Sequence, residues 1–420
     1  MKVLVVGSGG REHAIIWKLA KSERVDKIFC APGNAGISEL AQCVPIPATE
    51  VTKIADWAKD HEIDLTIIGM DDPLILGIVD KFEERGLRVF GPRQNAAILE
   101  GSKVFAKDLM KKYNIPTAGY EVFEEALIAK EYLKGCEYPV VLKADGLALG
   151  KGVLICQSVE EALVGVDEIM VDKKFGAAGS KMVVEEFMTG PEVSVLTFCD
   201  GENLIPMVSA QDHKRAFDND EGLNTGGMGT FSPSRFYTEE LAEECYEKLF
   251  VPSLKAMKLE GRPFTGIIFF GLMLTPSGPR VLEYNARFGD PEAQVVLTRL
   301  KTDLVDVFEA AIDGRLDELT LEWDDNSTVC VVLASGGYPV EYEKGYEITG
   351  LDQQKEEDGI YIFHAGTAMK EGKYVTNGGR VLGITAKGKN MDEARENAYK
   401  AVNEIDFLNK QYRTDIGIKR

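Results

Sequence analysis

The feature that most constrains the fold is an alternation of short apolar runs with helical patterns over the first hundred residues. The runs are KVLVVG, KIFCAPG, DLTIIG and LRVFGP, and the helical patterns between them include EHAIIWKLAKS and VTKIADWAKDH. Strands that alternate with helices in this way form a parallel sheet with helices on its faces. The sequence therefore predicts an open parallel α/β domain over residues 1–101.

The rest of the chain changes character along its length. PRQNAAILEGSKVFAKDLMKKYNIP predicts a long helical connector that stops at a proline. A smaller unit over residues 120–190 carries the strands YPVVLKAD, GVLICQ and KMVVEEF, and strands of antiparallel character follow over 191–300. A last α+β unit opens with TVCVVLASGG. We expect a multidomain α/β and α+β protein with domains at 1–101, 102–327 and 328–420.

Charge and composition exclude several classes of function. The chain has 420 residues, enough for more than one domain with a core of its own. Its formal charge of −20 argues against binding to nucleic acid or to an anionic membrane, because both attract a basic surface. An anionic substrate would therefore need a locally basic pocket.

The start of the chain and its cysteines indicate a location. MKVLVVGSGG predicts a strand and a glycine turn rather than a secretion signal, and no stretch has the length of a membrane span. The seven cysteines are scattered and form no CxxC pair, which argues against a disulfide framework and against a zinc site. We expect a cytoplasmic protein.

The first glycine-rich stretch, GSGGREHA, follows the first predicted strand. A dinucleotide-binding G-x-G-x-x-G pattern would need glycine where Glu12 stands, and no acid ends the second strand, so a nicotinamide-dependent dehydrogenase is disfavoured. Gly7, Gly9 and Gly10 at a helix start can still present backbone N–H groups to an anion. A tight turn without a ligand explains the same residues equally well.

The second stretch, KADGLALGKGV, lies at residues 143–153. It lacks the spacing and the Ser or Thr of a P-loop, which argues against a kinase or GTPase of that class. Lys143 ends one predicted strand, and a glycine hairpin with Lys151 leads into the next. This layout favours a loop that folds over phosphates, with lysine as compact positive charge, over a plain solvated hairpin.

The third stretch, QDHKRAFDNDEGLNTGGMGTFSP, covers residues 211–233. It places Asp212, His213, Lys214 and Arg215 beside a long glycine-rich loop, and such loops in compact domains are usually functional or disordered. The four histidines of the chain are too scattered to predict a metal cluster, so we expect each to lie on the surface or in a hydrogen bond.

The run VLEYN contains a pair of oxygen-bearing side chains. Because side chains alternate faces along a strand, Glu283 and Asn285 project on the same side, about 6 to 7 Å apart at their bases. Mg²⁺ prefers such oxygen ligands and commonly shares them with nucleotide phosphates. A wet polar face on an edge strand is the alternative, and the motif alone does not separate the two.

Eight motifs together carry a family resemblance. GSGGREHA, KADGLALGKGV, VVEEF, QDHKR, NTGGMG, LEYNARFGDPE, FHAG and TNGGRVLG resemble, in this order, the glycinamide ribonucleotide synthetase (phosphoribosylamine–glycine ligase) family of the ATP-grasp superfamily. The resemblance runs from residue 1 to about 417. It implies an ATP-grasp fold with an N-terminal pre-ATP-grasp substrate domain, a mobile lid at about 120–190 and a C-terminal α+β domain.

The resemblance also implies an activity. The family is a carbon–nitrogen ligase that joins glycine to 5-phosphoribosylamine and converts ATP to ADP and phosphate, in the second step of de novo purine biosynthesis. A carboxylate is a poor electrophile, so we expect glycyl phosphate as intermediate and catalysis by positioning and charge neutralisation. The implied partners are ATP, glycine and 5-phosphoribosylamine, without nucleic acid or membrane, and the implied assembly is a monomer or weak homodimer.

Site roles follow from the same resemblance. The implied metal ligands for Mg²⁺ or Mn²⁺ are Glu283 and Asn285. The implied ATP-binding residues are Lys107, Lys143, Gly150, Lys151, Gly152, Glu185, Glu186, Phe187 and Glu192. The implied catalytic residues are Arg287, Asp212 and Lys214. The implied substrate-binding residues are Gly9, Gly10, Arg11, Asp71, Gly226, Gly227, Asp290 and Arg380.

Three departures from the family pattern leave alternatives open. Gly69, Met70, Asp71 and Asp72 stand where Gly-Pro-Glu is usual, and Leu149 stands where alanine is common. FFGLMLT has no acid before the metal pair, which leaves open whether one or two metal ions bind. Another ligase on the same fold, such as a carboxylase or an amino-acid ligase, would share the nucleotide site but lack GREHA and NGGR. A nucleotide-sensing or scaffold protein with a decayed site is the alternative from a different class.

Overall fold

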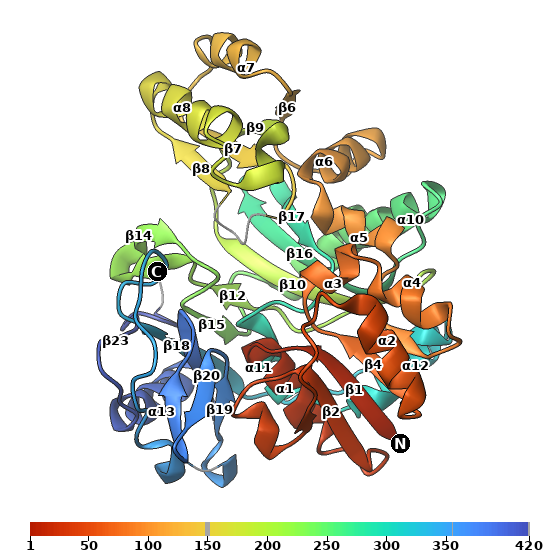
Figure 1. Ribbon diagram of the computed structural model, residues 1–420. Helices are drawn as coiled ribbons and strands as arrows, with labels where there is room; N and C mark the ends of the chain where they lie inside the picture. The colour runs from red at the N-terminus through yellow and green to blue at the C-terminus, as the bar shows by residue number, and fades with distance from the viewer. Residues whose placement is uncertain (148–151, 355, 419–420) are drawn as a thin grey trace.

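A computed structural model describes residues 1–147, 152–354 and 356–418. Figure 1 shows a broad body, with one smaller unit projecting from it and a hairpin beside the C-terminus. Gly150, Lys151 and Leu149 lie outside the described residues. Within the described residues, no helix has the length and apolar character needed to cross a membrane.

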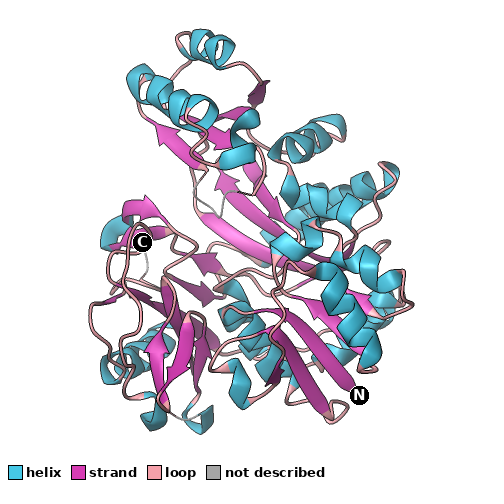
Figure 2. Ribbon diagram, in the orientation of Figure 1, coloured by secondary structure: helices cyan, strands magenta, loops and turns pink. Residues whose placement is uncertain are grey.

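The N-terminal domain is built on a parallel sheet of order β3-β2-β1-β4-β5. Val3 and Val5 pack into one core and Leu4 and Val6 into another, because alternate side chains of a strand face opposite sides. Helices cover both faces (Figure 2). The elements are β1 (Lys2–Gly7), α1 (Gly10–Leu19), β2 (Lys27–Pro32), β3 (Gln42–Cys43), α2 (Val51–Asp60), β4 (Leu65–Ile68), α3 (Asp71–Ile75), α4 (Ile78–Glu83) and β5 (Val89–Phe90). The predicted open parallel α/β architecture is confirmed, with β3 as an edge strand that the sequence reading missed.

The predicted helical connector is present, as two successive helices. The helices are α5 (Gln94–Gly101) and α6 (Lys103–Lys112). Between them Ser102 adopts an extended backbone, and its hydroxyl accepts a hydrogen bond from the Phe105 N–H at 3.1 Å. Serine favours this N-cap role because it satisfies a donor that the first helical turn leaves open.

The projecting unit is an antiparallel sheet of order β6-β9-β7-β8 with helices on one side (Figure 1). Its elements are β6 (Tyr120–Phe123), α7 (Ala126–Leu133), β7 (Val140–Ala144), β8 (Val153–Cys156), α8 (Val159–Val166) and β9 (Met182–Glu186). Lys143 pairs with Val153 across the β7–β8 hairpin, as KADGLALGKGV predicted.

The central sheet is antiparallel, of order β11-β10-β16-β17, as the strands over 191–300 predicted. Its elements and neighbours are β10 (Glu192–Asp200), β11 (Leu204–Pro206), α9 (Glu239–Cys245), α10 (Val251–Leu259), β16 (Thr265–Thr275), β17 (Gly278–Asn285), α11 (Glu292–Arg299) and α12 (Leu304–Ile312). Phe90 of β5 lies 4.5 Å from Phe308 of α12, ring centre to ring centre, so the N-terminal domain and this sheet share one core.

The C-terminal sheet, of order β12-β15-β18-β22-β19, takes two strands from earlier in the chain. Its elements and neighbours are β12 (Gln211–Asp212), β13 (Arg215–Phe217), β14 (Glu221–Asn224), β15 (Gly229–Ser232), β18 (Ser327–Ser335), β19 (Ile360–His364), β20 (Thr367–Lys370), β21 (Lys373–Thr376), β22 (Arg380–Gly388), α13 (Met391–Glu404) and β23 (Lys410–Gln411). Strands β12 and β15 thus cross the predicted boundary at residue 327, and the division into three domains stays a prediction.

Two buried histidines join the first and last parts of the chain. The ring Nδ1 of His13 accepts a hydrogen bond from the backbone N–H of His364 at 2.8 Å. Burial lowers the pKa of His13 to about 3 and that of His364 to about 4, so both rings are neutral at neutral pH. For these two residues the expectation of hydrogen-bonded histidine is confirmed.

Candidate active site

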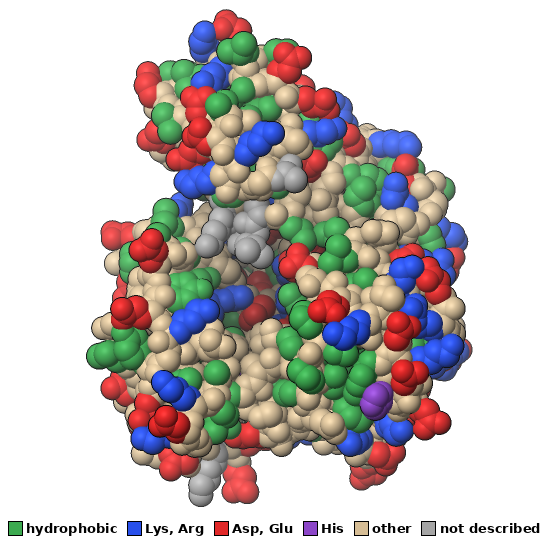
Figure 3. All heavy atoms as spheres, viewed as in Figure 1, with side chains coloured by type: hydrophobic (Ala, Val, Ile, Leu, Met, Phe, Trp, Pro, Cys, Tyr) green, Lys and Arg blue, Asp and Glu red, His purple; other side chains and the backbone are tan. Residues whose placement is uncertain are grey.

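Most of the predicted site residues meet at one cavity of about 1070 Å³. Figure 3 shows it as a hollow between the projecting unit and the body, with charged side chains inside. The predicted residues that line it are Arg11, Asp71, Lys107, Lys143, Gly152, Glu185, Glu186, Phe187, Glu192, Asp212, Lys214, Gly226, Glu283, Asn285, Arg287, Asp290 and Arg380.

The end of β17 orients Glu283 and Asn285 into the cavity. Tyr284 between them is 4% exposed and packs into the core behind the sheet, so its two neighbours face the opposite way. A bulge next to Leu282 shifts the pairing with β16, where Gly271 lies opposite Glu283. A Cβ atom on Gly271 would stand 3.0 Å from Glu283 Cγ, so glycine leaves room for the carboxylate.

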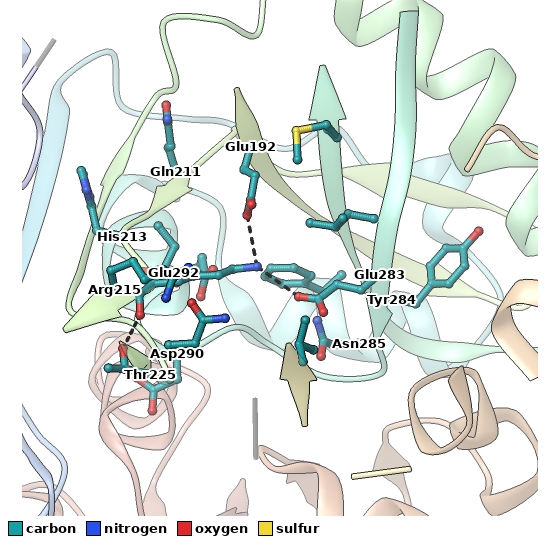
Figure 4. A pocket seen from close by; sticks show the side chains of 18 of the residues that line it. Glu192, Gln211, His213, Arg215, Thr225, Glu283, Tyr284, Asn285, Asp290 and Glu292 are labelled. Carbon is teal, nitrogen blue, oxygen red and sulfur yellow. Dashed lines mark hydrogen bonds and ion pairs between the residues drawn. The ribbon is translucent and has the colours of Figure 1, made fainter. Parts of the chain in front are cut away.

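Lys214 lies between two carboxylates from different strands. Its ammonium nitrogen is 3.3 Å from a Glu283 oxygen and 3.3 Å from a Glu192 oxygen. In Figure 4 Glu192 and Glu283 point toward the same space from opposite sides. The charge on Lys214, more than any other group, lowers the pKa of Glu283 to about 2. Burial opposes the charge on Lys214, but Glu192 and Glu283 outweigh it and raise the pKa of the ammonium group.

Glu283 and Asn285 suit a hard divalent cation. An ionised carboxylate and an amide oxygen are the ligand types that Mg²⁺ takes when nucleotide phosphates and water complete its shell. The low pKa keeps Glu283 ionised, and the group that balances its charge in this structure is itself a cation, Lys214. The donor set therefore fits the metal that the sequence predicts.

Two lysines of the cavity converge on Glu185 of β9. Lys143 and Lys107 lie 2.9 and 3.0 Å from the same oxygen of Glu185, and all three side chains are buried. Burial lowers the pKa of Lys107 to about 8, against the opposing effect of Glu185. The second oxygen of Glu185 is buried and accepts no hydrogen bond from the part of the chain that is described. Glu185 is thus not a solvated strand end but part of a dry, charged wall.

Arg287 joins three elements at the floor of the cavity. Its guanidinium lies 3.1 Å from Glu100, 3.3 Å from the Asn285 side-chain oxygen and 3.9 Å from Asp71. Its buried Nε–H finds no acceptor among the described residues. Burial would raise the pKa of Asp71, but Arg287 and Arg11 outweigh it and lower that pKa. The floor therefore holds an Asp71 with a lowered pKa and a buried guanidinium N–H without an acceptor among the described residues.

Asp212 and Glu292 form a pair of carboxyl groups that burial affects strongly. Burial and the neighbouring charge of Glu292 raise the pKa of Asp212, and burial also raises the pKa of Glu292. Glu292 is 5% exposed at the start of α11, and one Asp212 oxygen is buried without a hydrogen bond to any described residue. Burial therefore makes both Asp212 and Glu292 weaker acids than free carboxyl groups.

Arg380 ties the glycine-rich loop to Asp290. Its Nη1 donates to the backbone oxygens of Gly226 at 2.5 Å and Asp290 at 2.6 Å, and its Nη2 lies 3.2 Å from the Asp290 carboxylate. Gly227 is buried in this loop, where a Cβ atom would stand 2.8 Å from Asp212. Arg380 therefore holds Gly226 at the cavity wall, and Gly227 leaves room for the Asp212 carboxylate.

The first glycine turn is filled by the side chain of Glu12. The Gly9 N–H donates to the Glu12 carboxylate at 2.6 Å, and Arg11 Nε lies 2.7 Å from it. Glu12 is 1% exposed, and a Cβ atom on Gly7 would stand 2.5 Å from its Cγ. The anion at this helix start is therefore internal, so Gly9 is not proposed as a donor to substrate. Gly10 packs against Gln294, where a Cβ atom would meet Nε2 at 2.6 Å.

Sequence reasoning missed several charged residues of the cavity, among them Glu100, Lys103 and Glu292. Glu100 accepts a hydrogen bond from the Ala286 N–H at 2.7 Å and pairs with Arg287. Lys103 donates to the Gly146 oxygen at 2.8 Å. Glu292 stands in the quoted motif LEYNARFGDPE, and its position beside Asp290 was the signal that could have found it. Glu100 and Lys103 lie in an ordinary helical pattern that carries no such signal.

Comparisons with known proteins cover the whole chain. Family models of phosphoribosylglycinamide synthetase match in order: the N domain at residues 1–100, the ATP-grasp (A) domain at 101–293 and the C domain at 328–419. A phosphoribosylamine–glycine ligase from Caldanaerobacter subterraneus subsp. tengcongensis is 50% identical over 416 residues, 99% of each chain. One from Halalkalibacterium halodurans is 50% identical over 419 residues, 100% of this chain and 97% of the other.

Solved structures agree with these matches. The crystal structure of a phosphoribosylamine–glycine ligase from Thermotoga maritima has a TM-score of 0.87 and 37% identity, over 99% of this chain and 100% of that one. The biotin carboxylase domain of a Hydrogenobacter thermophilus 2-oxoglutarate carboxylase has a TM-score of 0.73 at 17% identity, over 98% of this chain and 91% of the other, and shows the shared fold alone. The predicted ATP-grasp fold is confirmed, and the chain belongs to the phosphoribosylglycinamide synthetase family.

Proposed function

We infer that this chain is a phosphoribosylamine–glycine ligase that joins glycine to 5-phosphoribosylamine, with ATP converted to ADP and phosphate. The observation that carries this inference is the contact of Lys214 with Glu283, beside Asn285 and Arg287, in a chain of this family. These groups supply positive charge and oxygen ligands rather than a nucleophile. A site of that kind suits phosphoryl transfer to a carboxylate, which depends on positioning and charge neutralisation.

ATP is proposed to lie between the projecting unit and the central sheet. Lys107 and Lys143 would contact phosphate oxygens, and the backbone at 185–187 would bind the adenine edge. Glu192 would accept hydrogen bonds from the ribose hydroxyls. Gly152 lines the cavity and would help to cover the phosphates. Gly150 and Lys151, which the sequence predicts for the same role, lie outside the described residues. Closure of the unit at about 120–190 would exclude water from the reaction.

Glu283 and Asn285 would hold Mg²⁺ or Mn²⁺, and the choice between the two metals is part of the proposal. A bound divalent cation neutralises charge on the ATP phosphates and orients the terminal phosphate. Asn285 also accepts a hydrogen bond from Arg287, so the same arginine that faces the substrate fixes the orientation of the amide oxygen. A matching arrangement of ligand and orienting group is common at metal sites.

The chain's own residues account for both chemical steps. Arg287 and Lys214 would neutralise the glycine carboxylate as it attacks the terminal phosphorus of ATP and forms glycyl phosphate. The amine of phosphoribosylamine then attacks the glycyl carbonyl, phosphate leaves, and the nitrogen gives up a proton. Asp212 and Glu292 line the cavity and have raised pKa values, and Asp212 is proposed to accept that proton.

Phosphoribosylamine is proposed to lie at the N-terminal side of the cavity. Arg11, Asp71 and Asp290 line it there, and Arg380 holds the adjoining Gly226 loop. Ligands of open α/β sheets gather beyond the carboxyl ends of the strands, where Asp71 follows β4. The monomeric or weakly dimeric state and the cytoplasmic location stay predictions from the sequence.

Phosphate release with each substrate omitted in turn tests the function. We expect release above background only when ATP, glycine, phosphoribosylamine and a divalent metal are all present, with glycinamide ribonucleotide formed in equal amount. Release with a different carboxylate or amine in place of these substrates, and none with them, would favour another ligase on the same fold. Nucleotide binding without phosphate release in any mixture would favour a nucleotide-sensing protein.

A further inference from the structure

The C-terminal segment, residues 413–417, lies against the tip of the hairpin formed by β13 and β14. Figure 1 shows the C-terminus beside β14. The Thr414 N–H donates to Asp218 at 2.7 Å, and the Asn219 N–H donates to Asp415 at 3.0 Å. Each of these two hydrogen bonds joins residues that lie 196 positions apart in the sequence.

Arg413 is the centre of this contact. Its side chain is 0% exposed and pairs with Asp415 through two hydrogen bonds, at 2.7 and 2.8 Å. Its Nη1 also donates to the Asp220 carboxylate at 2.8 Å and to the Arg215 backbone oxygen at 3.1 Å. A guanidinium is buried only where charged and polar partners surround it, and here two of those partners belong to the hairpin.

The other side of the C-terminal segment is fixed to α13. Arg395 donates to the backbone oxygens of Thr414 at 2.6 Å and Ile416 at 3.1 Å. The Tyr399 hydroxyl donates to the Arg413 oxygen at 2.7 Å. Because α13 packs on β18 and β22, the segment connects the hairpin to the core of the C-terminal sheet.

The hairpin needs such a connection. Strands β13 and β14 pair with each other as a sheet of their own, and Phe217 and Leu223 on them are 53% and 57% exposed. An isolated hairpin of this kind is marginally stable in water. The contacts from the C-terminal segment therefore supply order that the hairpin's own side chains do not.

Lys214 directly precedes β13, at the base of this hairpin. The N–H and the hydroxyl of Thr225, directly after β14, both donate to the Lys214 backbone oxygen at 2.8 Å. The pairing of β13 with β14 therefore begins at the backbone that carries Lys214. The ammonium group at the end of that side chain is the one that contacts Glu192 and Glu283 in the cavity.

We propose that Arg413 is a positioning residue for Lys214, acting through the hairpin of residues 215–224. The inference rests on the proposed function for the role of Lys214, but its structural part does not. Arg413 holds the tip, the tip fixes the strand pairing, and the pairing fixes the base where Lys214 emerges. A misplacement of about 1 Å in a catalytic group costs roughly 100-fold in rate, which is the scale of the effect expected.

A double-mutant cycle with Lys214 tests the proposal. We expect Arg413→Met to lower kcat about 10- to 100-fold with a smaller change in the KM for ATP, and Lys214→Met to lower kcat by about 100-fold or more. The double variant should match Lys214→Met within about threefold, because a residue that acts only through Lys214 has nothing left to position. Multiplied single effects in the double variant would overturn the proposal.

Two further variants separate positioning from loss of stability. Lys410→Met removes hydrogen bonds to the backbone oxygens of Val402 and Ile405 without touching the hairpin, so its effect should multiply with that of Lys214→Met.

Asp220→Asn removes the charge that pairs with Arg413 from the hairpin side, where the side chain is 58% exposed. If Arg413→Met fails to fold, Asp220→Asn should still lower kcat several-fold, and an unchanged kcat would overturn the proposal.

Hydrogen exchange gives a readout that does not depend on the ligase reaction. The backbone amides of residues 215–224 should exchange faster in Arg413→Met and in Asp220→Asn than in the parent chain, and not in Lys410→Met. Unchanged exchange would overturn the proposal. Faster exchange in a protein that makes no glycinamide ribonucleotide would instead count against the proposed function and leave the structural link between Arg413 and the hairpin supported.

Discussion

The ammonium nitrogen of Lys214 lies 3.3 Å from the carboxylate of Glu283, the residue that stands where a metal ligand is expected. This contact places a protein cation beside the proposed site of a metal cation. It keeps Glu283 ionised in the absence of metal and leaves the lysine next to the phosphates that the metal would bind. The charges of Lys214 and Glu283 therefore balance each other in the free protein, and both groups would also act in the proposed transition state.

Replacing either proposed metal ligand should abolish most turnover without unfolding the protein. We expect Glu283→Gln and Asn285→Leu each to lower kcat by about 100-fold or more, because each removes stabilisation of charge in the transition state. Glu202→Gln is the matched control, since Glu202 is an exposed carboxylate paired with Lys258. A near-normal rate in either variant at saturating Mg²⁺ would refute the assignment.

The buried Lys107 should give ATP binding a dependence on pH. Burial lowers its pKa to about 8, so the ammonium group carries its charge below that pH and loses it above. We expect kcat/KM for ATP to fall about tenfold per pH unit above pH 8. In Lys107→Arg the fall should disappear, because a guanidinium stays protonated. Lys103→Arg is the control, and disappearance of the fall there would assign it to Lys103.

Asp71 lies in IIGMDDPL, where the sequence departs from the usual family pattern, and its role can be tested by mutation. If its carboxylate binds phosphoribosylamine, Asp71→Asn should raise the KM for that substrate about tenfold or more and leave the KM values for ATP and glycine little changed. The alternative is that Asp71 only begins α3, where an acid stabilises the helix start by about 0.3 to 1 kcal/mol. Asp72 shares that first turn, so equal loss of thermal stability in Asp71→Asn and Asp72→Asn with unchanged KM values would support the alternative.

The turn around Glu12 should tolerate no side chain at Gly7. Gly7 has a φ of +138°, and a Cβ atom there would stand 2.5 Å from Glu12 Cγ. We expect Gly7→Ala to lower the free energy of unfolding by about 3 kcal/mol, from backbone strain and the displaced carboxylate together. Gly86→Ala, with φ +72° and no atom within 4 Å of the new Cβ, should cost only about 1 kcal/mol. Equal losses in denaturant titrations would show that backbone strain alone decides.

Local patterns predicted much of this architecture. Alternation of strands and helices gave the parallel sheet of the N-terminal domain, and period-two alternation placed Glu283 and Asn285 on the cavity side of β17, with Tyr284 in the core. Both follow from side-chain direction within one element. The motif KADGLALGKGV likewise predicted the β7–β8 hairpin, because glycine runs between apolar strands indicate a turn.

Contacts between distant segments were not accessible in the same way. Nothing near Arg413 in the sequence shows that it meets Asp220, and nothing near Glu100 shows that it pairs with Arg287. Ser102 caps α6 and separates it from α5. The residues on both sides of Ser102 follow a helical pattern, so the sequence does not indicate this interruption. Strands β12 and β15 joined the C-terminal sheet because pairing depends on tertiary packing rather than on local sequence.

The most direct test of the central claim follows one oxygen atom. In the proposed reaction the glycine carboxylate attacks the terminal phosphorus of ATP, and the bond from carbon to that oxygen breaks when the amine displaces phosphate. Glycine labelled with ¹⁸O in its carboxylate should therefore pass one labelled oxygen to inorganic phosphate in each turnover, as mass spectrometry of the phosphate would detect. Unlabelled phosphate under full turnover would contradict activation of the carboxylate by ATP.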